Sequence, residues 1–513
     1  MSDNVENNRD LPKSGEPDNE ENAYRETVRT ALRLSSNRVT QLDAEFHLVK
    51  ALNYNRNDAV REKLIHELAK LYFMKGNLGD AINLLVLLLE ATPSNVTYLQ
   101  NLADAVFWSG DIDAASNLYK KLISISYLSA KLGAERRNEP ITQLIHPHSV
   151  ICRVFGEMAG KIDLYVKARI LGLTPTVEAI LPAPEEDVPN KCLLDYWKKF
   201  APDHVRIVSD KAEITHYVER HKSEPVILDC YEMPDGRAYE RVIAYPMIQR
   251  QWEDEGRPPL LRITPSHEED GRRRLRDFGV PPDAWFICLH AREAGYYKET
   301  VSGSHNTSRN ARIDDFLPAI KAVTARGGWV FRIGDPSMTP LPPMDNVVDY
   351  ANHPLREESM DIFLIGSCRL FVGTNSGPID VAYVFGIPTL LTNLFPLLFR
   401  PLSRKDVFIH KLLRMREENR YLTIAEAVRP PLIGVHHPDF FADRGIEVLD
   451  NTSEDILDAV VEVLDIVEGK RSYSKEDEEL QQTYKGMSDY FGLGISSRVG
   501  GAFLRKHAFL IGA

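Results

Sequence analysis

Cysteine is scarce in this sequence and is spread thinly along it. Five cysteines occur in 513 residues, with no C-x-x-C pair and no histidine at the spacing of a zinc ligand. This pattern argues against a disulfide framework and against a structural metal site. We therefore expect no metal, and reduced, mostly buried thiols at Cys152, Cys192, Cys230, Cys288 and Cys368.

Long apolar runs are also missing. No stretch reaches 18 consecutive apolar residues, and the first residues do not form a charged segment followed by an apolar one. We expect neither a transmembrane segment nor a secretory leader. The expected location is the cytoplasm, either free or peripherally bound at the inner face of the membrane.

The sequence has no excess of basic residues. Its formal net charge is −12, which argues against nucleic acid as a partner. Acidic residues gather at the start, where residues 1–22 hold seven acidic and two basic side chains and show no apolar pattern. Such a segment is typical of a disordered tail.

The length indicates several domains. At about 150 residues per domain, the chain is long enough for about three folded parts. Its hydrophobic content of 43% allows each of them a packed core. The expected parts are an acidic tail (1–22), a helical domain (23–140), a first α/β domain (141–275), a second α/β domain (276–470) and a C-terminal helical segment that returns toward the first α/β domain (471–513).

Residues 62–126 contain a pattern that repeats after 34 residues. Gly76 corresponds to Gly110 and Ala81 to Ala115, so small residues recur where two helices of a pair must approach closely. The period resembles that of the tetratricopeptide repeat, or TPR. Such repeats hold partner peptides, which predicts a protein partner; the alternative is a helical packing module without a partner.

The first α/β domain offers two carboxylates. Glu157 and Asp229 each follow an apolar run that reads as a strand, and open α/β sheets bind ligands where their strands end. The alternative for each is a cap on the following helix. The elements behind this interpretation are a strand over 149–155, a glycine loop over 156–160, a helix over 161–171 and further strands over 204–208 and 225–230.

The second α/β domain carries the sharpest motif, over residues 371–388. An apolar strand leads into a loop of small residues, a helix and a Gly-x-Pro break. The backbone N–H groups of such a loop and the positive end of the following helix can hold an anion such as a phosphate. The predicted anion-binding loop comprises Thr374, Asn375, Ser376 and Gly377.

Two other predicted strands of this domain end in polar clusters. The strand over 285–290 ends at His290, Arg292 and Glu293. Arg292 is a candidate phosphate clamp, since guanidinium donates two hydrogen bonds at once, and His290 a candidate proton carrier or a structural hydrogen-bonder. The strand over 328–333 adds the pocket candidates Arg332, Gly334 and Asp335, with a structural ion pair as the alternative for Arg332.

Several of these motifs occur together in one known family. The segments 290–296, 309–311, 328–338, 373–377 and 384–388 together resemble a bacterial family of glycosyltransferases associated with surface-polysaccharide gene sets. More distantly, the segment after strand 371–373 is similar to the donor-phosphate loop of heptosyltransferases, with Asn375 in place of an Asp and Asp380 in place of a His. The Gly156-Glu157 pair is similar to their Gly-Asp loop, whose acidic residue is the proposed base.

The resemblance implies a GT-B fold, in which two Rossmann-like domains face a cleft, preceded here by the TPR-like segment. It implies a nucleotide-sugar donor as substrate, a glycan, lipid-linked or protein acceptor, no cofactor and no obligatory metal. The absence of an Asp-x-Asp motif at a predicted strand end agrees with metal independence.

The mechanism implied is direct displacement at the anomeric carbon. A carboxylate removes the acceptor's proton, with Glu157, then Asp229, then Glu293 as the order of candidates. Arg292, the loop amides and the following helix, with Asp380 in its first turn, stabilise the leaving diphosphate. The alternatives are an epimerase-like enzyme of the same fold and a non-catalytic scaffold built on the repeats.

Overall fold

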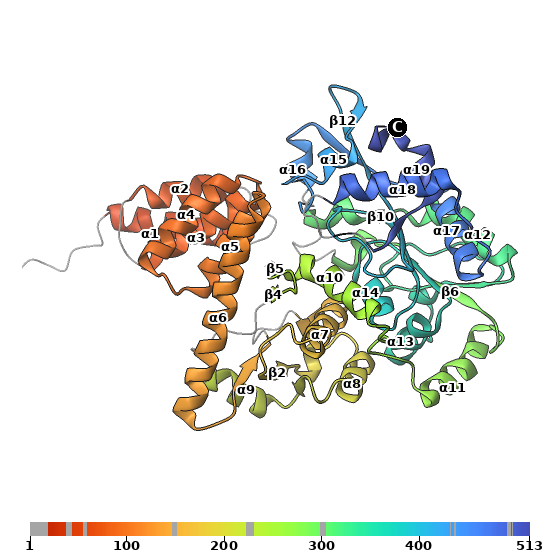
Figure 1. Cartoon of the computed structure of the whole chain (residues 1–513), viewed down its shortest axis with the longest axis horizontal. Coiled ribbons are helices and arrows are strands. Elements are labelled where there is room, and N and C mark those ends of the chain that lie inside the picture. Colours follow the sequence, from red (N-terminus) through yellow and green to blue (C-terminus); the bar gives the residue numbers. More distant parts are fainter. Residues whose placement is uncertain are drawn as a thin grey trace, which may run out of the picture. The chain divides into compact units, whose positions relative to one another are not determined.

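The computed structural model describes two compact units, 1–93 and 94–513 (Figure 1). Asp229 and the acidic tail up to residue 18 lie outside the described residues, so nothing structural bears on them. The described residues are 19–36, 44–54, 59–145, 151–221, 230–297, 304–430, 432–435, 438–489, 494 and 496–512.

The first unit is entirely helical. It contains α1 (Asn19–Ser36), α2 (Glu45–Leu52), α3 (Ala59–Met74) and α4 (Leu78–Ala91). Helices α3 and α4 form a pair whose turn needs Gly76 at a φ of 76°, a conformation that favours glycine. Ala31, Leu48, Leu64, Leu68 and Leu71 form a buried core.

The second unit begins with another helix pair, α5 (Val96–Trp108) and α6 (Ile112–Arg137). Gly110, at a φ of 99°, makes its turn as Gly76 does in the first pair. The 34-residue pattern therefore corresponds to two successive helix pairs. The boundary after Pro93 separates these pairs, so the segment 23–140 is divided between the two units.

A parallel sheet of three strands follows, β1 (Thr142–Leu144), β2 (Glu178–Pro182) and β3 (Arg206–Val208), in that spatial order. Helices α7 (Phe155–Ile170) and α8 (Lys191–Phe200) connect them. Buried Leu144, Ile180 and Val208 pack against Tyr217 of α9 (Lys211–Arg220). A hairpin of β4 (Cys230–Glu232) and β5 (Ala238–Glu240) then leads into α10 (Arg241–Asp254).

One expected motif of this region is wrong. Residues 151–153 form a turn of 3-10 helix, and α7 begins at Phe155, so the expected glycine loop 156–160 is helical. The glycines serve packing instead of a loop: a Cβ at Gly160 would lie 3.6 Å from the Tyr245 ring of α10. The described part of the expected strand 225–230 is Cys230 alone, the first residue of β4.

The large sheet has seven parallel strands in the order β15-β11-β10-β9-β6-β7-β8. The chain runs outward from β6 in one direction and then returns to place β9 on the other side of β6. The strands are β6 (Phe286–His290), β7 (Trp329–Arg332), β8 (Val347–Val348), β9 (Leu370–Gly373), β10 (Thr389–Leu394), β11 (Val407–His410) and β15 (Arg498–Val499).

Helices cover both faces of this sheet. Ile287 and Leu289 face α12 (Leu317–Ala325) and α17 (Ser453–Val467), which lie side by side in Figure 1. Phe286, which alternates with them, contacts the Phe363 ring on α13 (Glu358–Ser367), and α13 packs beside α14 (Gly377–Val384). This mixed α/β architecture behind an all-helical segment confirms the predicted fold class.

The remaining elements form a second, small sheet and complete the edge of the large one. A small antiparallel sheet of β12 (Leu412–Met415), β13 (Arg420–Tyr421) and β14 (Ile446–Leu449) follows β11, together with α15 (Ile424–Ala427) and α16 (Pro438–Ala442). The C-terminal segment contains α18 (Lys475–Ser488) and α19 (Gly501–Lys506), and its strand β15 pairs with β11. Across the described residues, none of the helices has the length and apolar character that a membrane span needs.

Candidate functional site

The candidate site lies where β6 and β9 end next to each other. These strands pair in parallel, with His290 opposite Gly373, and they mark the point at which the strand order reverses. Two hydrogen bonds join the loops that follow them. The Arg292 N–H donates to Thr374 Oγ1 (3.0 Å), and the Thr374 N–H donates to the His290 carbonyl (3.1 Å). Open α/β sheets bind ligands in the crevice at such a reversal.

Three cationic side chains converge on this edge. Arg292 is 7% exposed and donates to the Asn310 side-chain oxygen. Arg309 donates to the carbonyl of Asn375 through Nη2 (2.6 Å) and Nε (3.2 Å). The loop after β6 thus binds the loop after β9 through the Arg292 backbone N–H and the Arg309 guanidinium.

Lys411 is the third cation and comes from the end of β11. Its ammonium donates to the Asn310 carbonyl (2.8 Å) and to Asp450 (2.5 Å), and the residue is 4% exposed. Burial lowers the pKa of Lys411, while Asp450 acts in the opposite direction. Asn310 therefore links Arg292 and Lys411 through its side chain and its backbone.

The predicted anion-binding loop begins α14. Ser376 is the N-cap residue in extended conformation, but its side chain makes no capping bond, and its buried Oγ has no partner among the described residues. The first turn of α14 therefore lacks the usual side-chain cap, although the Ser376 carbonyl accepts from the Ile379 N–H (3.2 Å). Asn375 is held by its side-chain bond to the Phe395 carbonyl (3.4 Å).

A cavity of about 520 Å³ opens beside Lys411 and Asn310. Asn310, Lys411 and Asp450 line it together with apolar residues of β14 and α16 and the charged residues Arg416 and Glu447. The volume lies within the range of small-molecule pockets, about 300–1,000 Å³. Its lining residues include Ala311, Phe441, Ala442, Ile446 and Val448.

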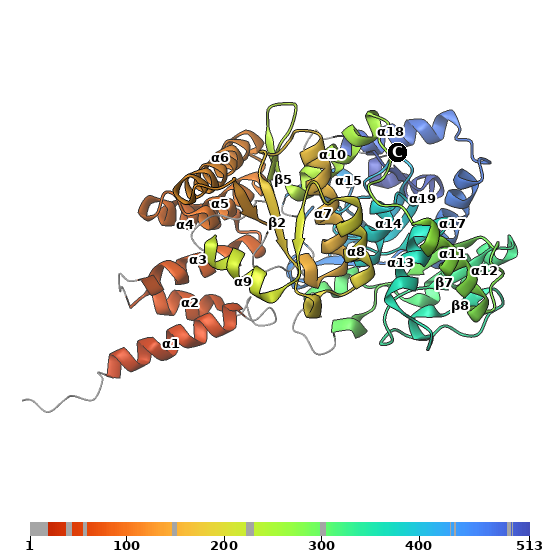
Figure 2. The ribbon, with the colours of Figure 1, turned by 90° about the horizontal axis from the view of Figure 1, so that it is seen from below.

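Glu157 lies in the first turn of α7, which packs against the start of α14 (Figure 2). Gly156 and Gly377 make this contact possible: a Cβ at Gly156 would lie 2.6 Å from Gly377 Cα. Lys161 (3.4 Å) and Arg241 (3.6 Å) pair with the Glu157 carboxylate. The predicted base and the predicted anion loop are thus brought together at two helix starts.

Asp380 faces the same contact from α14. A Cβ at Gly156 would lie 2.5 Å from its Oδ2. Desolvation, with the nearby Glu157 charge as the next cause, raises the pKa of Asp380 to about 8, against the opposing effect of Arg241 and Arg309. Two carboxyl groups, those of Glu157 and Asp380, therefore lie near the same helix contact.

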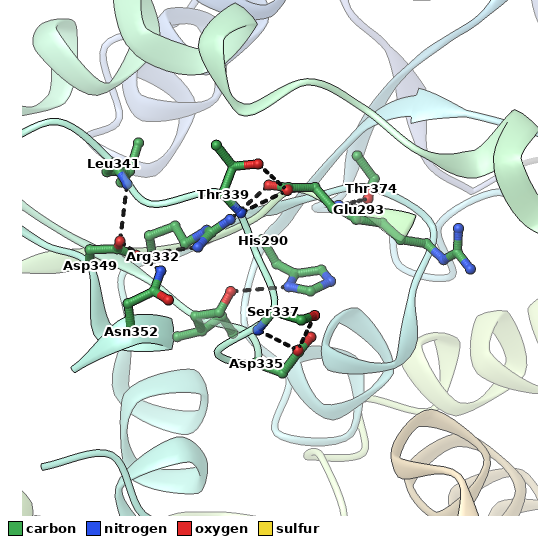
Figure 3. Close-up of polar contacts among 12 residues, drawn as sticks. His290, Glu293, Arg332, Asp335, Ser337, Thr339, Leu341, Asp349, Asn352 and Thr374 are labelled. Atoms are coloured by element: carbon green, nitrogen blue, oxygen red, sulfur yellow. Dashed lines mark hydrogen bonds and ion pairs between the residues drawn. The ribbon is translucent and has the colours of Figure 1, made fainter. Parts of the chain in front are cut away.

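The structure places Glu293 and Arg332 in a separate network (Figure 3). Glu293 accepts from Arg332 (2.8 Å) and from the backbone and hydroxyl of Thr339 (2.8 and 2.7 Å). Arg332 is fully buried and also pairs with Asp349 (3.3 Å). The alternative given above for Arg332, a structural ion pair, is the arrangement observed.

His290, Gly334 and Asp335 lie around the loop after β7. The His290 ring bonds the Ile333 carbonyl (3.1 Å), and burial lowers the pKa of His290 to about 4. Asp335 accepts from Ser337 N–H and Oγ–H (2.9 and 2.5 Å), closing a turn in Figure 3. Gly334 takes a φ of 151° against Met338. The His290 ring and the Asp335 side chain thus bond to this loop, whereas the His290 carbonyl accepts from the Thr374 N–H at the candidate site.

Sequence reasoning missed the roles of Arg241, Arg309, Lys411 and Asp450. Lys411 carries a readable signal, because it follows an apolar strand ending in His410 much as Arg292 follows one ending in His290. Arg241 and Asp450 have no comparable local signal. In the part of the chain that the structure describes, no group of three His, Cys, Asp or Glu side chains is arranged to hold a metal.

No protein-family model matches this chain, and no curated protein matches it. Solved structures of similar shape include the E. coli ADP-heptose lps heptosyltransferase II, with 14% identity over 53% of this chain and 90% of that chain (TM-score 0.35). A glycosyl transferase family 9 protein from Veillonella parvula has 11% identity over 63% and 96% (TM-score 0.35). An O-GlcNAc transferase from Thermobaculum terrenum has 13% identity over 96% and 97% (TM-score 0.21).

Proposed function

We propose that the protein is a glycosyltransferase of the GT-B type that moves a sugar from a nucleotide-sugar donor to a glycan, lipid-linked or protein acceptor. The observation that carries this proposal is the convergence of Arg292, Arg309, Lys411 and the start of α14 at the reversal point between β6 and β9. A nucleoside diphosphate is the ligand whose shape and charge fit such an edge.

The donor's diphosphate would lie against these cations. Guanidinium groups bind phosphate oxygens in pairs, and the start of α14 adds its partial positive charge. The charge that gathers on the departing diphosphate is then stabilised by protein groups, with no divalent ion required. The nucleoside would occupy the adjoining cavity, whose lining combines Asn310 and Lys411 with apolar side chains such as Phe441.

The acceptor would approach Glu157. The acceptor hydroxyl attacks the anomeric carbon, and Glu157 takes the proton of that hydroxyl. The bond between the anomeric carbon and the diphosphate oxygen breaks at the same time. Glu157 lies at the helix contact that also contains Gly377. The proposed base on α7 and the proposed diphosphate site at the start of α14 therefore lie on facing helices. Glu293, engaged by Arg332 and Thr339, is not given this role.

A thermal-shift screen against UDP-, GDP-, CMP- and ADP-sugars tests the proposal. A ligand that binds only the folded protein at a hundred times its dissociation constant adds about 2.7 kcal/mol of stability, which raises Tm. At least one donor class should raise Tm. The variants Arg309→Ala and Lys411→Ala should remove this shift, because each deletes a cation at the edge.

Arg326→Ala is the matched control. Arg326 pairs with Asp465 (2.7 Å) between α12 and α17, away from the edge, so its removal should leave the shift in place. A screen in which no nucleotide or nucleotide-sugar changes Tm would contradict the proposal. If the donor raised the Tm of Arg309→Ala as much as that of the control, the donor would not bind at this edge of the sheet.

A further inference from the structure

Two buried asparagines are hydrogen-bonded next to the segment that carries Lys411. Asn393 belongs to β10 and is 2% exposed, and Asn451 follows β14 and is 3% exposed. The Asn393 N–H donates to Asn451 Oδ1 (2.6 Å), and the Asn451 N–H donates to Asn393 Oδ1 (2.7 Å). The Asn451 side-chain amide also donates to the His410 carbonyl (2.8 Å). The ends of β10 and β11 and the turn before α17 are therefore joined at one point.

The backbone of Asn393 explains why the pair forms there. Its φ is 50°, in the left-handed region, which asparagine tolerates better than most residues. The register between β10 and β11 shifts at this place: Leu391 lies opposite Phe408 and Leu394 opposite His410, so β10 uses one residue more than β11. Such an extra residue interrupts the regular ladder. Here the Asn393 N–H donates to the Asn451 side chain.

This network lies on both sides of an ion pair of the candidate site. His410 precedes Lys411, and Asn451 follows Asp450. The Lys411 ammonium donates to Asp450 (2.5 Å) and to the Asn310 carbonyl (2.8 Å). Because Asn451 bonds the residue before Lys411 and is itself the residue after Asp450, it sets the distance between the two backbones that carry the ion pair.

Building on the transferase function above, we propose that Asn451 is a positioning residue for Lys411. Together with Asn393 it fixes the backbone on which the lysine is held, and it does not contact the donor itself. A lysine side chain has high conformational entropy, and ordering it at the moment of binding would weaken affinity. With Asn451 in place, this ordering occurs during folding, and the diphosphate meets an ammonium that is already fixed.

Asn451 uses both ends of its side-chain amide, because Oδ1 accepts one bond and Nδ2 donates another. Asn451→Ala removes both bonds. Asn393→Gly is the milder variant: glycine adopts the left-handed φ freely, so only the acceptor for the Asn451 N–H is lost. Two variants on different strands therefore test one network, and the second does so with little strain.

Lysine acylation by an N-hydroxysuccinimide ester, followed by mass spectrometry, tests the positioning without any ligand. Lys411 is 4% exposed and should react far more slowly in wild type than exposed Lys475. In Asn451→Ala and in Asn393→Gly the rate at Lys411 should rise by about threefold to tenfold, since lost buried hydrogen bonds ease local opening. Lys167, 3% exposed on α7, should keep its rate. An unchanged rate at Lys411, or an equal rise at Lys167, overturns the proposal.

Gln143→Ala is the matched control. Gln143 is 5% exposed, and its side-chain amide donates to the carbonyl and the hydroxyl of Ser126 on α6 (3.1 and 3.0 Å). Its removal also costs buried hydrogen bonds and should lower Tm. The acylation rate at Lys411 should stay as in wild type. A rise at Lys411 in this control equal to that in Asn451→Ala would show that general destabilisation causes the effect, and would overturn the proposal.

Calorimetric titration with ADP, GDP and UDP supplies the second measurement. Asn451→Ala should lose about threefold to tenfold in affinity, because the ligand must then order Lys411 itself. Gln143→Ala should bind as wild type does. Unchanged affinity in Asn451→Ala, or an equal loss in the control, overturns the positioning role. If no nucleoside diphosphate binds wild type while the acylation difference persists, the transferase function fails and the positioning of Lys411 by Asn451 stands.

Discussion

Residues that occur in similar sequence patterns have different contacts in the structure. Arg292 and Arg332 both belong to polar clusters at strand ends, yet Arg292 reaches the cation cluster and Arg332 is enclosed by Glu293 and Asp349. The difference depends on which carboxylates fold against each guanidinium, and those carboxylates are supplied by other loops. Local sequence could name the candidates, but only tertiary contacts separate them.

We predict that Glu293→Gln destabilises the protein and leaves nucleotide binding in place. The substitution leaves fully buried Arg332 with one carboxylate, which costs about 1–3 kcal/mol. Urea denaturation measures the loss, and the thermal shift with the best donor tests binding. Glu479→Gln, in an exposed pair with Lys475, is the control and should cost at most about 0.5 kcal/mol. If Glu293→Gln lost nucleotide binding while its free energy of unfolding stayed the same, Glu293 would again be a candidate for the catalytic base.

The buried histidines predict a loss of stability in acid. Burial lowers the pKa of His290 and of His410 to about 4, so both stay neutral in the folded protein while they gain a proton when unfolded. Between the usual histidine value and about pH 4, each should reduce the free energy of unfolding by up to about 1.4 kcal/mol per unit fall in pH. Urea titrations near pH 7 and near pH 5 measure this. His410→Asn should flatten the dependence, and an unchanged slope in that variant would contradict the assignment.

Among the elements, the predictable strands were those with continuous apolar runs. The expected strands over 285–290, 328–333 and 371–373 correspond to β6, β7 and β9, because buried parallel strands need apolar side chains on both faces. The start of α7 was not predictable in this way. Gly156 and Gly160 look like loop residues, but they occur inside a helix because other elements approach it there, and such an approach leaves no local trace.

We predict that Gly377→Ala separates α7 from α14. Its Cβ would lie 2.9 Å from the Gly156 nitrogen, which is backbone and cannot rotate away. Overpacking of this kind costs about 1–3 kcal/mol, and the displaced helix start should weaken nucleotide binding as well. Gly486→Ala in α18 is the control: nothing lies within 4 Å, so it should stabilise by about 0.5–1 kcal/mol. Urea denaturation distinguishes the two, and a neutral Gly377→Ala would show that the contact is loose.

At the scale of the whole molecule, the site depends on pairings that no short segment encodes. β6 meets β9 across more than eighty residues, and Lys411 reaches Asn310 across about a hundred. Sequence periodicity gives the strands but not their spatial order, so the reversal point and the third cation emerge only from the assembled sheet. The loop at 374–377 could be named beforehand because its small residues are contiguous.

The division after Pro93 predicts an independent second unit. A chain that begins at Ser94 retains the three-stranded sheet, the seven-stranded sheet and every residue assigned to the site. It should unfold cooperatively and show the same thermal shift with the best donor as the full chain. Calorimetry and the donor screen check this, and a fragment without a cooperative transition would mean that residues 1–93 are needed for folding.

The two hydrogen bonds between the loops after β6 and β9 have a consequence for recognition. Because His290, Arg292 and Thr374 fix these loops to each other, their conformational freedom is given up during folding and not at the moment of encounter. On the proposed function, a diphosphate would bind loops that need little further ordering. Selectivity among ligands would then depend on how well the charge and length of each ligand match a preorganised site.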